Sequence, residues 1–158
     1  MRHIKKGSIV FCLLLFLVTA PGAETLRIGI GLETNMNTRD GYALGRSVSL
    51  DFQIFKYIVN GVTLTISDDF GIFTVIEPEV FGRWYFKDFG FKGGGFFIQA
   101  DLGVSLVIEA SETKPHILGG LTAGFRYPFL GGDYYVEPFI KSGYPFIWGA
   151  GARVGCRF

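Results

Sequence analysis

Residue types that carry out catalysis are scarce in this chain of 158 residues, which has two histidines and two cysteines. Acyl transfer needs a nucleophilic hydroxyl, a base that activates it and an acid that orients the base. His116 is a candidate base, and Ser111 and Glu112 are near it in the stretch SETKPHILGG. Nothing in this spacing fixes a triad, so we interpret His116 as a solvated loop histidine. The sequence predicts no enzyme activity.

Two glycine-rich stretches resemble nucleotide-binding motifs only superficially. Gly149, Gly151 and Gly155 are spaced as G-x-G-x-x-x-G, but the dinucleotide fingerprint needs a helix directly after it, and no helical pattern follows. We interpret these glycines as making room inside a narrow lumen. The stretch 92–95, KGGG, lacks the Lys-Ser/Thr pair of a phosphate loop and is typical of a flexible turn. No cofactor or metal site is predicted.

Charged side chains recur at alternate positions of otherwise apolar segments. They are the last group of candidate functional residues. The set is Arg27, Glu33, Asp51, Glu77, Glu79, Arg83, Asp101, Glu109, Arg126, Glu137, Lys141, Arg153 and Arg157. Two interpretations stay open for it. The charges form a salt-bridged plug that fills an interior, or they line a path for ions or solutes.

The elements that must position these charges are long strands. From Phe96 to Glu109 the even positions are all apolar, whereas the odd positions are mostly polar or small. A period of two over 14 residues indicates a strand with one apolar face, and this one is much longer than the five or six residues usual in soluble proteins.

Similar segments recur along the chain. They span 26–33, 47–55, 62–67, 72–86, 118–129, 134–141 and 146–158, which with 96–109 makes eight strands. Turns are expected at Asn60-Gly61, 87–95 and 130–133 at one end, and at 34–41, 67–71, 110–115 and 143–145 at the other. Because proline cannot donate to a ladder, Pro78 and Pro138 predict bulges or irregular spots within strands.

The apolar faces are predicted to point outward. They carry almost no charge, and the opposite faces are rich in Gly, Ser and Thr but poor in Lys. Rings cluster toward strand ends, at Trp84, Tyr85, Phe86, Phe89, Phe91, Phe96 and Phe97, and at Phe125, Tyr127, Phe129, Tyr134 and Tyr135. Aromatic girdles at the two lipid interfaces have this appearance. A net charge of +1 without a basic patch argues against nucleic-acid binding.

Residues 1–23 have the features of a secretory signal peptide. Arg2, Lys5 and Lys6 precede a short apolar run that ends on small residues. The run is too short to span a bilayer as a helix, which takes about 20 residues. We therefore divide the chain into a cleaved signal peptide, 1–23, and one barrel domain, 24–158. Cys12 is removed with the signal, which leaves Cys156 without a disulfide partner.

The last segment, FIWGAGARVGCRF, carries Trp148, Val154, Cys156 and Phe158 on one face. This ending resembles the C-terminal signal of outer-membrane barrel proteins, which implies recognition of these residues by the barrel-assembly machinery. With the signal peptide and the eight amphipathic strands, the whole of 24–158 resembles the small barrels of the OmpX, OmpW and OmpA-membrane-domain kind.

The expected fold is therefore all-β, an eight-stranded antiparallel up-and-down transmembrane barrel in the bacterial outer membrane, in contact with its lipid. The expected role is structural or a surface interaction with an unknown ligand, and polar side chains plug the lumen. One alternative is a narrow OmpW-like channel for small or hydrophobic solutes. A second alternative is a lipid-modifying enzyme, for which no Ser–His pair is found.

The 130–133 turn allows one specific prediction inside the barrel. Arg126 and Glu137 lie equally far from the centre of this turn, so they are expected to face each other and form an ion pair. Gln99 and Arg153 are expected at a similar height. Arg83, Asp101 and Glu77 complete the predicted charge network.

Overall fold

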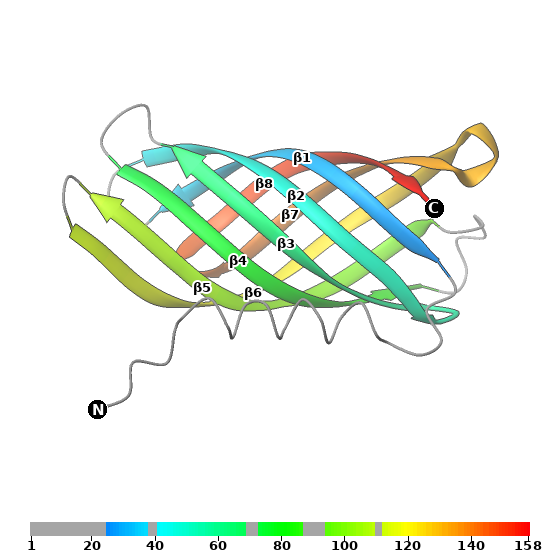
Figure 1. The fold of residues 1–158 in the computed structure, drawn as a ribbon, viewed down its shortest axis with the longest axis horizontal. Helices are drawn as coiled ribbons and strands as arrows, with labels where there is room; N and C mark the ends of the chain where they lie inside the picture. The colour runs from blue at the N-terminus through cyan, green and yellow to red at the C-terminus, as the bar shows by residue number, and fades with distance from the viewer. Residues whose placement is uncertain (1–24, 38–40, 69–72, 87–93, 110–111) are drawn as a thin grey trace.

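Long alternating segments pair side by side until the sheet closes on itself. The computed structural model describes residues 25–37, 41–68, 73–86, 94–109 and 112–158. Within them are eight strands: β1 (Leu26–Asn37), β2 (Gly41–Phe55), β3 (Ile58–Asp68), β4 (Phe73–Tyr85), β5 (Gly95–Glu109), β6 (Glu112–Phe129), β7 (Tyr134–Tyr144) and β8 (Phe146–Arg157). They form a closed barrel in chain order, with every neighbouring pair antiparallel (Figure 1). The predicted fold class is confirmed. The predicted signal peptide lies outside the described residues.

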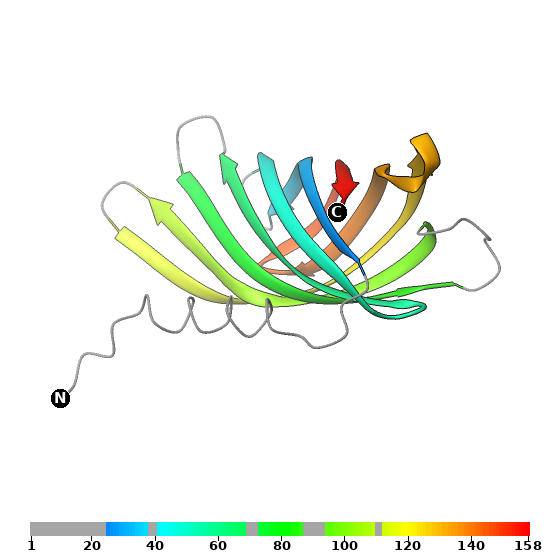
Figure 2. The same ribbon diagram turned by 45° about the vertical axis from the view of Figure 1, so that its right-hand side comes forward.

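The barrel is closed by pairing of β1 with β8. Their register places Ile30 opposite Val154, and the Phe158 amide donates to the Leu26 carbonyl over 2.8 Å. Closure satisfies the backbone groups that an open sheet would leave unpaired at its edges. The strands cross the barrel obliquely, and β8 finishes at the end that also holds the β2–β3 and β6–β7 connections (Figures 1 and 2). We call this the terminus end, and the opposite end the far end.

The predicted Asn60-Gly61 turn is wrong. β2 and β3 are joined at Lys56-Tyr57, and Gly61 lies inside β3 opposite Asp51. The glycine is needed there for space, because a side-chain carbon at Gly61 would lie 2.5 Å from Cζ of the inward-facing Phe81 ring. The Asn-Gly pair therefore reflects packing within the lumen and not hairpin chemistry.

The irregular spots predicted at Pro78 and Pro138 are present, but neither of them is a bulge. The β4–β5 register is the same on either side of Pro78, and the β6–β7 register is the same on either side of Pro138. In each case pairing lapses for two residues and then resumes. The missing proline N–H interrupts the ladder locally without adding a residue to it.

The 3₁₀ turn Leu130–Gly132 connects β6 to β7 at the terminus end, as predicted. At the far end the strands extend further than the pattern indicated, since β1 continues to Asn37 and β6 begins at Glu112. His116 therefore lies in β6 opposite Ser105, and its prediction as a loop residue is wrong. Among the described residues no helix has the length and apolar character to cross a membrane.

Alternation divides the barrel wall into two faces. Most serine, threonine and charged side chains of the strands are buried inside, whereas large aliphatic side chains are exposed outside on every strand. The prediction that the aromatic residues form outer girdles is only half right. Trp84, Phe86 and Phe96 are exposed outside, but other rings from the same clusters, Tyr85, Phe97 and Tyr135, are buried in the lumen. Phe89 and Phe91 lie outside the described residues.

Candidate functional site: the charged lumen

Glu137 of β7 is the centre of the buried charge network. Its side chain is 0% exposed and accepts hydrogen bonds from three guanidinium groups. Arg126 Nε donates over 2.6 Å, Arg83 Nη1 over 2.8 Å and Arg153 Nη1 over 3.1 Å. Because these residues come from β6, β4 and β8, the network ties together strands across the interior as well as neighbouring strands.

A second carboxylate, Asp51 of β2, extends the network to the other side of the barrel. Arg126 Nη1 donates to Asp51 Oδ2 over 3.0 Å, and Arg27 of β1 lies directly opposite Asp51 in the β1–β2 register. We call Arg27, Arg83, Arg126 and Arg153, together with Asp51 and Glu137, the arginine layer. All six are at most 5% exposed, and they occupy the terminus half of the lumen.

Aromatic rings pack against the guanidinium planes of this layer. Arg126 Cζ lies 4.0 Å from the Tyr135 ring centroid, and Arg83 Cζ lies 4.2 Å from that of Phe97. Arg83 Nη1 also donates to the Tyr85 hydroxyl over 3.1 Å. Stacking of this kind stabilises a desolvated cation. The rings thus help the arginines to remain charged inside the barrel.

Inward glycines make the space for these rings. A side-chain carbon at Gly29 would lie 2.6 Å from the Tyr135 hydroxyl, and one at Gly151 would lie 2.7 Å from Phe139 Cζ. The glycine spacing that superficially resembled a nucleotide motif is therefore a packing feature of β8.

A polar bridge leads from the arginine layer toward the far end. Arg83 Nε donates to Gln99 Oε1 over 2.7 Å, and the Gln99 amide donates to Asp101. Asp101 also accepts from the Thr122 hydroxyl over 2.7 Å.

Beyond this bridge the far half of the lumen is acidic. Glu33, Glu77, Glu79 and Asp101 face it from β1, β4 and β5. Lys141 Nζ donates to Glu33 Oε1 over 2.5 Å, and the Asn35 amide donates to the same oxygen over 2.9 Å. We call Glu33, Glu77, Glu79, Asp101 and Lys141 together the acidic layer. The lumen thus holds its arginines toward the terminus end and most of its carboxyl groups toward the far end.

The structure brings together part of the predicted network. Arg126, Glu137, Arg153 and Arg83 are in direct contact, whereas Asp101 reaches them through Gln99. Glu77 is also buried, but it lies in the acidic layer.

Two of the predicted inward charges lie at the rims. Arg157 pairs with Asp133 over 3.6 Å at the terminus end, and exposed Glu109 pairs with Lys114 over 3.6 Å at the far end. Alternation alone does not distinguish a lumen position from a rim position, because both fall on the same face of a strand.

The residues of the predicted assembly signal lie along the outer face of β8. Phe158, Val154 and Trp148 are exposed, and Cys156 is half-buried on the same face. Trp148 packs edge-on against Tyr42 of β2 with the ring centroids 6.0 Å apart.

The candidate catalytic residues are not brought together in the described part of the chain. The His116 ring lies 6.4 Å from that of Tyr144, and Glu112 forms an ion pair with Lys114 over 3.4 Å. Ser111 lies outside the described residues. Across the described ranges, no group of three His, Cys, Asp or Glu side chains could hold a metal ion.

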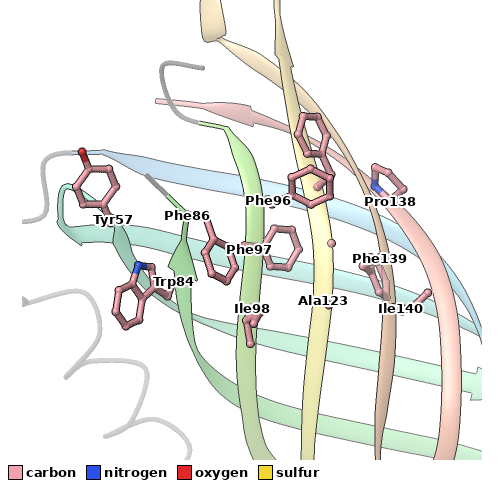
Figure 3. A pocket seen from close by; sticks show the side chains of 12 residues that line it. Tyr57, Trp84, Phe86, Phe96, Phe97, Ile98, Ala123, Pro138, Phe139 and Ile140 are labelled. Carbon is pink, nitrogen blue, oxygen red and sulfur yellow. The ribbon is translucent and has the colours of Figure 1, made fainter. Parts of the chain in front are cut away.

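The outer wall carries an apolar groove of about 1040 Å³ near the terminus end. Trp84 and Phe86 line one side of it, Ala123 and Ile140 line the other, and Phe96 is also part of its lining (Figure 3). Its lining is almost wholly apolar, so it suits a hydrocarbon chain and not a polar solute.

These features define a class of closed eight-stranded barrels that are apolar outside and charged inside. No known protein family and no curated protein matches the sequence. The fold is similar to solved structures of bacterial outer-membrane proteins. The N-terminal β-barrel domain of Pseudomonas aeruginosa OprF aligns with a TM-score of 0.66 at 15% identity, over 87% of this chain and 99% of that one.

Two further structures share the fold. Neisserial surface protein A aligns with a TM-score of 0.61 at 10% identity, over 84% of this chain and 94% of that chain. Ail of Yersinia pestis, in a phospholipid bilayer nanodisc, aligns with a TM-score of 0.52 at 12% identity, over 85% and 99% of the two chains. The resemblance to small outer-membrane barrels is thus confirmed at the level of fold.

Proposed function

We propose that the protein is an integral β-barrel of the bacterial outer membrane with a structural or surface-interaction role and no catalytic activity. Its lumen is closed by the arginine layer and the acidic layer. The single observation that carries the proposal is the inverted distribution of side chains, with apolar residues outside and charged residues inside.

The outer face supports membrane insertion. Ile30, Leu32, Leu102, Leu121 and Ile140 are each at least 60% exposed, and similar residues continue around the barrel. A soluble monomer rarely exposes contiguous apolar patches larger than a few hundred Å². A hydrocarbon environment removes the cost of exposing this surface to water, and the exposed rings of Trp84 and Phe86 suit the lipid interface.

The interior supports a closed lumen. Eight strands enclose a space just wide enough for side chains to fill, and long side chains occupy it here. Glu137 binds arginines from three strands, and the rings of Tyr85, Phe97 and Tyr135 fill the space beside them. A path through this layer would require several of these contacts to break at once.

Fractionation of cells that produce the protein tests its location. We expect the protein in the outer-membrane fraction, extractable by detergent, with a gel mobility that changes on boiling. Its recovery as a folded protein in the soluble periplasmic fraction would refute the proposal.

A narrow channel is the second candidate, and buried hydroxyls favour it. Ser47 and Ser49 of β2 and Thr63 and Thr65 of β3 are at most 3% exposed, and their side-chain oxygens have no hydrogen-bond partner among the described residues. Buried polar atoms are normally satisfied by protein or by water. Ordered water along β2 and β3 would satisfy them and could form part of a path for small solutes.

The outer face of β8 supports two partners. Phe158, Val154 and Trp148 present an apolar, partly aromatic row at the last strand, which suits recognition by the barrel-assembly machinery. After insertion the same row is in contact with membrane lipid.

A further inference from the structure

The arginine layer holds more positive than negative charge. Four guanidinium groups face two carboxylates, Asp51 and Glu137, among the described residues of the layer. Glu137 is shared by three arginines, and Asp51 by one of them. Arginine stays protonated in proteins. An excess of positive charge in a desolvated interior is costly unless a counter-charge compensates for it.

The acidic layer is poorly placed to supply this counter-charge. Along β4, Glu79 lies four residues from Arg83, which corresponds to about 13 Å of strand. Along β1, Glu33 lies six residues from Arg27 and is already bound by Lys141 and Asn35. No hydrogen bond between described residues joins a carboxylate of the acidic layer directly to an arginine, since Asp101 reaches Arg83 only through Gln99.

Unpartnered donors in the layer point to a site for a hydrogen-bond acceptor. Arg27 Nη1, Arg83 Nη2, Arg126 Nη2 and Arg153 Nε are all buried and have no hydrogen-bond partner among the described residues. A buried donor without an acceptor is unusual, and here each of the four arginines has one. Asp51 Oδ1 is an unpartnered acceptor in the same layer, which a bound water could satisfy.

Two further unpartnered polar atoms lie near the side chains of the arginine layer. The Tyr135 and Ser49 hydroxyls are buried and unpartnered, and both lie with the Arg153 side chain around the position of the missing side chain of Gly29. Hydroxyls and guanidinium N–H groups are the donors that bind small anions in proteins. The layer therefore combines surplus positive charge with surplus donors.

We propose that the arginine layer is a binding site for a small inorganic anion of the size of chloride. The anion accepts hydrogen bonds from the free guanidinium N–H groups and offsets the excess charge of the layer. The compactness of the layer, in which rings already pack at about 4 Å from two of the guanidinium groups, favours a monatomic anion over phosphate.

Chloride binding can be measured on the protein folded in detergent micelles. The thermal unfolding midpoint is followed as gluconate is replaced by chloride at constant ionic strength. A ligand that binds only the folded state raises the midpoint, so we expect a saturable rise with chloride. A midpoint that does not depend on the choice of anion would overturn the proposal.

A pair of charge-matched variants locates the site. Arg27→Gln removes one unpartnered donor without touching Glu137, and we expect it to weaken chloride binding about tenfold, as for the loss of one charge-assisted hydrogen bond. Arg46→Gln is the control, because Arg46 is 74% exposed on the outer face and makes only a 4.0 Å pair with Asp68. It should leave chloride binding unchanged, and equal weakening by both variants would contradict the site.

A second measurement needs no variant. Crystals of the wild-type protein grown with bromide should show an anomalous scattering peak within contact distance of at least two of the four arginines. Water molecules alone on those nitrogens, with no bromide peak, would overturn the proposal even if Arg27→Gln fails to fold.

Discussion

Replacing Glu137 by alanine removes the carboxylate on which the arginine layer converges. Arg83, Arg126 and Arg153 each lose their hydrogen bond to it, and among them only Arg126 retains a carboxylate partner, Asp51 at 3.0 Å. The substitution therefore leaves uncompensated cations in a site that is 0% exposed before the change. We expect Glu137→Ala to be among the most destabilising single changes in the barrel.

The magnitude depends on how dry the lumen is. Breaking a buried ion pair by removing one partner costs about 3–5 kcal/mol of the free energy of unfolding. Breaking a pair in a hydrated lumen lowers the free energy of unfolding by about 1 kcal/mol or less, as for exposed pairs. Complete burial of Glu137 and of its partner Arg83 favours the first value.

Urea unfolding of the protein in lipid or detergent, followed by tryptophan fluorescence, gives the free energy of unfolding for each variant. Glu112→Ala is the control, because Glu112 is 71% exposed and makes only a 3.4 Å pair with Lys114; its cost should stay below about 0.5 kcal/mol. A loss of about 1 kcal/mol or less for Glu137→Ala, close to that of the control, would refute the reasoning that the layer is a dry, closed plug.

Three other predictions concern the inward glycines, the outer wall and the C-terminal residue. Gly151→Val should destabilise the barrel by about 1–3 kcal/mol through overpacking. Gly119→Val should change the urea midpoint little, because a side-chain carbon at Gly119 has open space around it. Equal effects of the two substitutions would contradict the packing role of the inward glycines. Leu121→Arg, on the outer face in the middle of β6, should lower the free energy of unfolding in a bilayer by about 2–4 kcal/mol. Leu130→Arg, in the exposed turn, should lower it by about 0–1 kcal/mol. Equal losses would argue against a lipid-facing wall. Deletion of Phe158 should reduce the amount of folded barrel in cell membranes, measured by the change of gel mobility on boiling, while refolding in detergent is retained. Normal assembly of the deletion variant in cells would mean that Phe158 is only a lipid-facing ring.

Period-two alternation predicted the eight strands and the inward position of the charges, because a strand places successive side chains on opposite faces. The contact between Arg126 and Glu137 could be anticipated from their equal distance to one turn. The same alternation could have placed Tyr85 in the lumen, since it lies two residues from Arg83. Its aromatic character suggested a lipid interface instead.

Other features need the closed barrel itself. Arg83 reaches Glu137 although 54 residues separate them, and only the tilt and stagger of the strands bring β4 opposite β7. The hairpin expected at Asn60-Gly61 was misleading because local turn propensity takes no account of Phe81, which needs the space beside Gly61. The rim positions of Arg157 and Glu109 likewise depend on where each strand ends.

Conductance of the refolded protein in a planar lipid bilayer tests the central claim most directly. We propose that the arginine layer and the rings beside it close the lumen of a membrane-embedded barrel. We therefore expect the wild-type protein to insert and to give no steady unitary conductance. Steady conductance steps of the inserted wild-type protein would contradict the closed lumen and favour the narrow channel.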